Sequence, residues 1–251
     1  MRNAYLIVAT LFALAAPARA QPDAAAFSMF ASGAYEEAAA LATAEGGAEN
    51  LALAARALNA KAYLQSEDKA SREISKRALE LAEDAMDADA SVVEGHLQAA
   101  IALAQRGGRM APIRAFVLGI AGRARDQLDY ALEADPENPW ALSSSAAWHL
   151  EVARRVGEGR FGSDSALGFE QFQKARALDP DNILIAYECA LRLLASDKPQ
   201  WREAALSSLD MVVASAPDDA FSGAMKERGV ALAAAVAAGR KAERAFVESQ
   251  P

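Results

Sequence analysis

One pattern of helix, turn and helix recurs along the chain and restricts the folds that the chain can adopt. Its clearest copy spans residues 127–150, where an apolar stripe at helical spacing stops at Asp135-Pro136. Proline ends a helix because it has no N–H for the hydrogen-bond ladder and pushes the preceding residue out of the helical region. Pro139 then stands in the first turn of the next helix, where proline is tolerated.

The same pattern is repeated at a roughly constant spacing. Residues 175–182 match residues 131–138 almost class for class, and weaker copies occupy residues 85–90 and 212–217. The turn positions Ala90, Pro136, Pro180 and Pro217 are 46, 44 and 37 residues apart. An internal period of this size predicts helix pairs stacked into a solenoid.

Small residues stand at fixed offsets from each turn, where they would let neighbouring helices approach closely. They are Ala78, Ala124, Gly168 and Ala205, then Ala85, Ala131, Ala175 and Val212, and finally Ala100, Ala146 and Ala190. Because these offsets recur together with the proline turns, the chain resembles the tetratricopeptide repeat (TPR) family, and Gly33–Ala38 resembles the start of that family's second helix. The resemblance covers about residues 27–221 and implies an all-α, TPR-like solenoid of antiparallel helix pairs. The repeat period of this chain is longer than that of the family. The aromatic residue of the family's first helix is missing here, and His149 and Leu193 stand near its place.

The helices expected from periodicity and from proline or glycine breaks leave only short linkers and no domain boundary within residues 21–251. We expect helices over residues 23–32, 35–44, 48–65, 69–88, 92–105, 112–134, 139–156, 163–178, 183–195, 201–214 and 220–248. The last of these is read as a C-terminal capping helix, since a terminal repeat must present a polar outer face.

The first 20 residues have the features of a cleaved signal peptide. Arg2 precedes an apolar run, and Ala18-Arg19-Ala20 forms a small-residue cleavage site before Gln21. The run is shorter than the roughly 20 residues that span a bilayer, although an uncleaved anchor is the alternative. We therefore expect export to a periplasm.

Composition argues against several classes of function. The chain carries 34 acidic and 26 basic residues, and its first 20 residues contribute two arginines and no acid. The exported part is therefore acidic, which is unfavourable for nucleic-acid binding. The single Cys189 excludes an internal disulfide, and a buried small hydrophobe is its simplest interpretation.

The sequence offers little for catalysis. His96 and His149 both fall inside expected helices, where packing is their usual role, and no metalloprotease, nucleophile-elbow or phosphate-loop motif is present. Acidic pairs at the turns are explained by helix capping. We expect no enzyme activity, no cofactor and no metal site.

Two surfaces are candidates for binding. A basic edge is formed by Arg106, Arg109, Arg154, Arg155 and Arg160, with no acidic residue between Gly95 and Arg125. It would suit an acidic partner or an anionic membrane surface, although arginine near helix C-termini also compensates the helix dipole.

The second surface is the concave side, which the first helix of each pair would line. The repeat offsets place there Glu94, Leu97 and Ile101, then Trp140, Ser143 and Ala147, and then Leu184, Tyr187 and Leu191. Packing between repeats is the alternative role for Trp140 and Tyr187.

Two functions follow from these surfaces. The first is an exported, non-enzymatic scaffold that binds a protein or peptide on its concave face. The second rests on residues 160–166, Phe169 and Phe172, which resemble the periplasmic helical-repeat subunits that accompany TRAP-type transporters. That resemblance implies a cleft for a small organic anion, with Arg154 or Arg160 as carboxylate partners.

Overall fold

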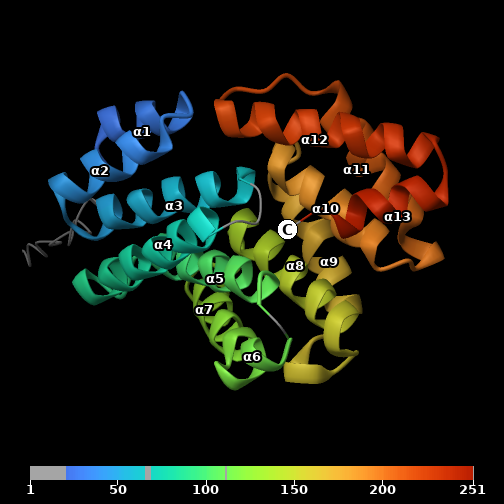
Figure 1. Cartoon of the computed structure of the whole chain (residues 1–251), viewed down its shortest axis with the longest axis horizontal. Coiled ribbons are helices and arrows are strands. Elements are labelled where there is room, and N and C mark those ends of the chain that lie inside the picture. The colour runs from blue at the N-terminus through green and yellow to red at the C-terminus, as the bar shows by residue number, and fades with distance from the viewer. Residues whose placement is uncertain (1–20, 66–68, 111, 251) are drawn as a thin grey trace, which may run out of the picture.

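The computed structural model describes residues 21–65, 69–110 and 112–250, and within these ranges the chain is all-α (Figure 1). The expected signal peptide lies outside the described residues. The helices are α1 (Ala24–Ala31), α2 (Tyr35–Glu45), α3 (Ala48–Leu64), α4 (Lys69–Ala88), α5 (Val93–Gly108), α6 (Pro112–Val117), α7 (Ile120–Ala134), α8 (Pro139–Val156), α9 (Ser165–Leu178), α10 (Ile183–Ala195), α11 (Arg202–Ala214), α12 (Ala220–Ala237) and α13 (Arg240–Glu248). Two short 3₁₀ turns, η1 (Arg160–Gly162) and η2 (Pro199–Trp201), complete the fold, so the predicted all-α class is confirmed.

The three repeated turns that contain proline lead into helices with a side-chain cap, whereas α5 begins after Ala90 without one. The Asn138 side chain accepts hydrogen bonds from the backbone of Trp140 (3.0 Å) and Ala141 (3.1 Å) at the start of α8. Asn182 does the same for Ile185 (3.1 Å) at the start of α10. Each cap satisfies backbone donors that a helix start leaves unpaired.

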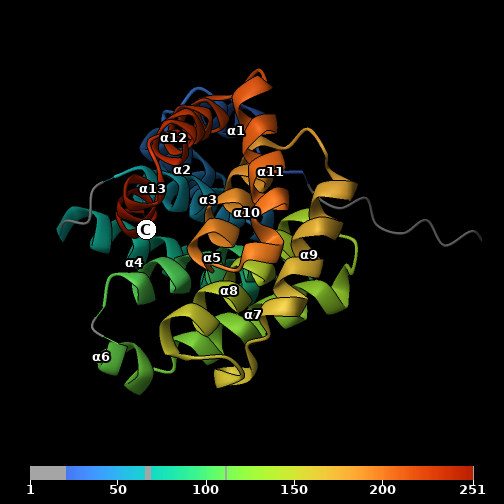
Figure 2. The same cartoon turned by 90° about the vertical axis from the view of Figure 1, so that its right-hand side faces the viewer.

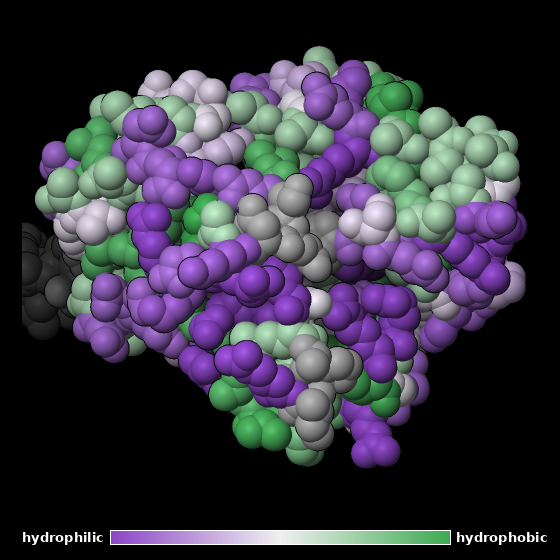
Figure 3. All heavy atoms as spheres, in the orientation of Figure 1, coloured by the Kyte–Doolittle hydropathy of each residue, from purple (hydrophilic) through white to green (hydrophobic). Residues whose placement is uncertain are grey.

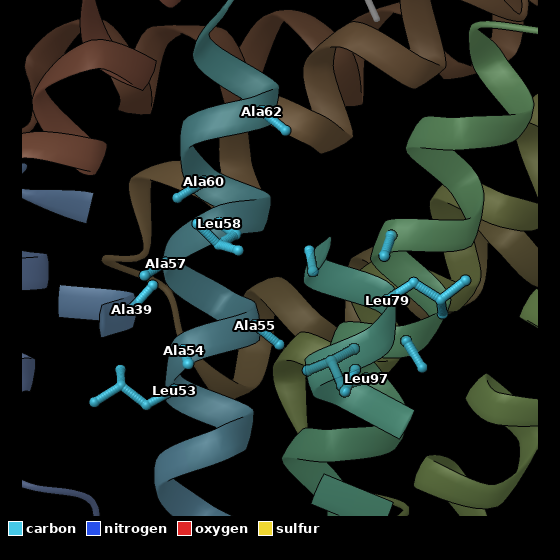
Figure 4. Close-up of a cluster of buried hydrophobic side chains, with 14 of the residues drawn as sticks. Ala39, Leu53, Ala54, Ala55, Ala57, Leu58, Ala60, Ala62, Leu79 and Leu97 are labelled. Atoms are coloured by element: carbon cyan, nitrogen blue, oxygen red, sulfur yellow. The ribbon is translucent and has the colours of Figure 1, made fainter. Parts of the chain in front are cut away.

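Neighbouring helices pack in pairs through small side chains. The contacting pairs are α1 with α2, α3 with α4, α5 with α7, α8 with α9, α10 with α11 and α12 with α13. All eleven small residues expected at the helix contacts are buried. Figure 4 shows Ala57 of α3 beside Ala39 of α2, with Ala55 and Ala62 on the other side of α3.

Two helices expected to be continuous are interrupted by glycine. The helix expected over residues 112–134 breaks at Gly119, whose φ of +60° is left-handed, and α7 begins after it. The expected capping helix over residues 220–248 is wrong as a single element, because Gly239 (φ +105°) turns the chain back. The resulting α13 packs on α12 and also on α10.

The path of the pairs is curved enough for the two ends of the fold to meet. Helix α1 contacts α12, and Gly33 is so close to Ala220 that an added Cβ would lie 3.0 Å from the alanine Cβ. Arg228 of α12 donates to the backbone oxygen of Tyr63 at the end of α3 (3.0 Å) and lies over the Tyr63 ring. Figures 1 and 2 show α12 facing the N-terminal helices across the fold. Within the described residues, no helix is sufficiently long and apolar to cross a membrane.

Candidate functional site

The helices α3, α5, α8 and α10 surround a cavity of about 630 Å³ on the inner side of the fold. Its walls are mainly apolar, with Leu97 and Ile101 from α5 and Ala147 and Val152 from α8. A volume of 300–1,000 Å³ with apolar walls and a few polar groups is typical of a small-molecule site.

One end of the cavity holds an arginine between two aromatic rings. The Arg56 guanidinium lies 5.0 Å from the ring centre of Phe30 and 5.4 Å from that of Trp140. Its nearest carboxylate is Glu94, at 3.9 Å. Cation–π contacts of this kind hold a charged group in an otherwise apolar wall.

A cluster of charges lies at another part of the wall. Glu151 of α8 pairs with Arg154 (2.6 Å), with Arg155 and, across to α10, with Arg192 (3.6 Å). Arg192 also pairs with Glu188 (3.0 Å), which accepts a hydrogen bond from the Tyr63 hydroxyl of α3. The cluster therefore joins α3, α8 and α10 through side chains that border the cavity.

The pKa values of the cluster reflect this mutual pairing. Burial alone would raise the pKa of Glu151, but the hydrogen bond from Arg154 and the charges of Arg192 and Arg155 lower it to about 2. Burial would lower the pKa of Arg192, but the carboxylates of Glu188 and Glu151 raise it. The pKa of the Tyr63 hydroxyl is raised by burial and by the charge of Glu188. Glu151 and Arg192 thus stay charged and Tyr63 stays a hydrogen-bond donor at neutral pH.

The charges that line the cavity are unequal in number. Four arginines line it, Arg56, Arg154, Arg155 and Arg192, together with three carboxylates, Glu94, Glu151 and Glu188. Arg154 and Arg155 share the single carboxylate of Glu151, and about two fifths of each arginine side chain is exposed. An added anion could therefore bind these guanidinium groups without displacing Glu151.

The residues predicted for the concave face separate into two groups. Glu94, Leu97, Ile101, Trp140 and Ser143 all line the cavity, as do Ala147 and Leu184. In contrast, Tyr187 and Leu191 lie in the core, with 0% and 1% of their surface exposed. Tyr187 packs towards Gly229 of α12 and donates to the Gln250 side chain, so it offers no surface to a partner.

The arginines predicted for the basic edge also separate. Arg154 and Arg155 border the cavity, and Arg155 donates to the Gly108 backbone oxygen at the end of α5 (3.3 Å). Arg160 is exposed on η1, and Arg106 is half-buried near the end of α5. Arg109 turns inward, where it donates to the Ala62 backbone oxygen (2.7 Å) and to Ser75.

The histidines and the cysteine have packing roles in the described part of the chain. His96 stacks on Tyr130 and bonds to Gln127 and the Ala90 backbone oxygen. His149 accepts a hydrogen bond from the Asp164 backbone N–H, and burial together with the charge of Arg125 lowers its pKa. Cys189 is buried beside Ser208, and burial raises its pKa. No group of residues suited to hold a metal occurs among the described residues.

Sequence reasoning named Arg154 and Arg155 but missed Glu151, Glu188 and Arg192 of the charge cluster, although a signal for these three residues was present. Glu151 continues the cavity-facing stripe of α8 one turn beyond Ala147. On α10, steps of four residues from Leu184 reach Glu188 and Arg192, whereas the predicted steps of three and four reached Tyr187 and Leu191. Both step sizes fit a helix of 3.6 residues per turn, so the choice between the two faces needed the structure.

Comparison with protein-family models and with curated proteins gave no match to this chain.

Proposed function

We propose that this protein is a non-enzymatic binding protein for a small amphipathic organic anion, which it would hold in the cavity between α3, α5, α8 and α10. The observation that carries the proposal is the apolar cavity of about 630 Å³ bordered by Arg154 and Arg155. Apolar walls favour a hydrocarbon body, and the excess of arginine over carboxylate favours an acidic head group.

This proposal develops the transporter-accessory hypothesis rather than the peptide-binding scaffold. A peptide groove was expected to use Trp140 together with Tyr187. Trp140 lines the cavity, but Tyr187 is buried against α12, so the two do not share an accessible groove. The proposal also includes an exported location, which rests on the signal-peptide features of residues 1–20, and association with a solute transporter, which rests on the resemblance of residues 160–166, Phe169 and Phe172.

The first experiment is a fluorescence titration of the chain beginning at Gln21 with anilinonaphthalene sulfonate, an aromatic anion that brightens in apolar surroundings. Decanoate and decanol are then compared as competitors, because they share a hydrocarbon chain and differ in the charged head. We expect decanoate to displace the dye at a lower concentration. Equal displacement by the two would contradict the anion preference, and an absence of dye binding would contradict the cavity as a ligand site.

Two variants locate the binding. Ala147→Trp places a large ring in the cavity and should abolish dye binding while preserving the helical circular dichroism spectrum. The double variant Arg154→Gln, Arg155→Gln should weaken decanoate binding at least about tenfold, since each charge-assisted hydrogen bond contributes about 1.5–3 kcal/mol, and should have little effect on decanol. The matched control is Arg72→Gln, which changes an exposed arginine of α4.

A further inference from the structure

Large apolar side chains are exposed together at the end of the molecule where the cavity opens. Phe116 and Val117 end α6 and Leu118 follows them, and the three are 64%, 75% and 44% exposed. Val156 ends α8 and Phe161 lies in η1, and these two are 45% and 37% exposed. We call these five residues the tip. Phe116, Val156 and Phe161 also line the cavity, and the rings of Phe116 and Phe161 are 6.0 Å apart. Figures 1 and 2 both place α6 and the turn after α8 at the lower end of the molecule.

The backbone supports the position of the Phe161 ring. Phe161 has φ +55°, a left-handed conformation that bulky residues seldom adopt. Its carbonyl oxygen accepts a hydrogen bond from Arg125 of α7 (2.8 Å), which fixes the turn. A strained backbone that holds an aromatic residue at the surface is unfavourable for stability alone, so it is consistent with a binding role.

The charge around the tip is positive, although the whole chain has a net charge of −8. Arg114 and Arg160 are exposed beside the apolar residues, and neither forms an ion pair with a described carboxylate. The nearby acids are Glu158, which pairs with Lys198 (3.7 Å), Asp129, which pairs with Arg125 (3.2 Å), and Asp164, whose side chain caps the start of α9. An anionic surface would therefore be attracted to this end and repelled by the rest of the molecule.

We infer that the tip docks on an anionic phospholipid bilayer, with Phe116, Val117, Leu118 and Phe161 inserted among the lipid head groups. The apolar side chains project from one end, and hydrophobic atoms lie beside hydrophilic ones at the lower end of the space-filling view (Figure 3). Projecting aromatic and aliphatic residues flanked by arginine suit the boundary between head groups and acyl chains. A protein partner would instead need a surface with complementary shape. Docking would place the cavity mouth against the bilayer, and the inference stands whether or not the cavity binds an organic anion.

The test is flotation of the chain beginning at Gln21, which contains every described helix, with two kinds of vesicle. We expect the protein to float with vesicles of phosphatidylcholine and phosphatidylglycerol and to remain in solution with phosphatidylcholine alone. Added salt should weaken the association because it screens the arginines. Failure to float with the anionic vesicles would overturn the inference without affecting the dye titration.

Variants separate specific docking from general adhesion. Phe116→Ser combined with Val117→Ser should weaken vesicle binding at least about tenfold, since two apolar side chains no longer insert. Arg114→Gln should weaken it about fivefold, the factor expected for one basic residue near an anionic surface.

The controls are Phe27→Ser with Val230→Ser, which removes two exposed apolar residues from α1 and α12, and Arg72→Gln on α4. These variants should bind as the wild type does. Equal losses of vesicle binding in the tip variants and the control variants would overturn the assignment of the tip as the docking surface. It would also be overturned if light scattering showed a dimer that the tip variants dissociate, because the apolar residues would then belong to a contact between two copies.

Discussion

At the scale of single residues, Glu151 is the centre of the charged wall of the cavity. It balances Arg154, Arg155 and Arg192, and its side chain is only 20% exposed. A carboxylate held by three guanidinium groups is favoured in its charged form, and this preference links stability to pH.

The pKa of Glu151, about 2 in the folded protein, predicts a loss of stability in acid. Because the folded pKa lies below the ordinary glutamate value of 4.5, this contribution is complete above pH 4.5 and is lost as the pH falls towards 2. The difference in unfolding free energy between the wild type and Glu151→Gln should therefore shrink by about 3 kcal/mol between pH 6 and pH 2. Urea denaturation over this range measures it, with Glu133→Gln on the exposed side of α7 as the charge control. A difference that stays constant with pH would contradict the pairing.

A second residue-scale prediction concerns the close contact between α8 and α9. A Cβ on Gly168 would lie 3.0 Å from both the Ala146 backbone oxygen and the His149 Cβ. Gly168→Ala should therefore destabilise the fold by about 1–3 kcal/mol, although alanine favours helix. Gly223→Ala on α12 is the control, because its nearest neighbour is 4.0 Å away. Equal effects of the two substitutions in chemical denaturation would show that the α8–α9 contact is not tight.

At the scale of helices, the sequence predicted where most of them begin and end. Proline and asparagine at the repeated turns define the starts of α8 and α10, and both helices have the predicted bounds. The breaks at Gly119 and Gly239 were missed because an isolated glycine is compatible with a helix as well as with its end. Contacts of α13 with α10 and α12 favour the bent arrangement at Gly239, and these contacts are distant in sequence.

Two glycine substitutions should therefore have opposite effects. Gly239→Ala forces an alanine into a left-handed backbone and should destabilise the fold by about 1–3 kcal/mol. Gly122→Ala, in the first turn of α7 with no neighbour within 4 Å, should stabilise it by about 0.5 kcal/mol. Thermal unfolding of the two variants measures the sign of each change. A shift in the same direction would disprove the helix break at Gly239.

At the scale of the whole molecule, the closed path depends on contacts that no local pattern encodes. Tyr63 and Glu188 are 125 residues apart, and Arg228 bonds to a backbone oxygen 165 residues away. The repeat predicted the helix pairs, and of the residues that its offsets assigned to the concave face, all but Tyr187 and Leu191 line the cavity. It could not predict that α1 meets α12, because the curvature accumulates from a small rotation at every pair.

Arg228 should hold the two ends of the fold together. Arg228→Met keeps most of the side-chain volume but removes the hydrogen bond to Tyr63 and the cation–π contact. We expect amide hydrogen exchange to rise at the end of α3 and in α12 together, because Arg228 joins these two helices, and to change little in α5 and α7. Arg244→Met is the matched control, because this exposed arginine of α13 pairs with Asp197 far from the junction. Faster exchange confined to α12 would show that the ends are not coupled.

The contact between α1 and α12 has a consequence for how such a protein can change over generations. An open array of repeats can gain or lose a unit and remain folded, since each unit touches only its neighbours. Here an inserted helix pair would move α12 away from α1, and a deleted pair would drive the two helices into one another. Because the ends meet, the fold is expected to keep its number of pairs, and the cavity wall would then change by substitution instead of by duplication.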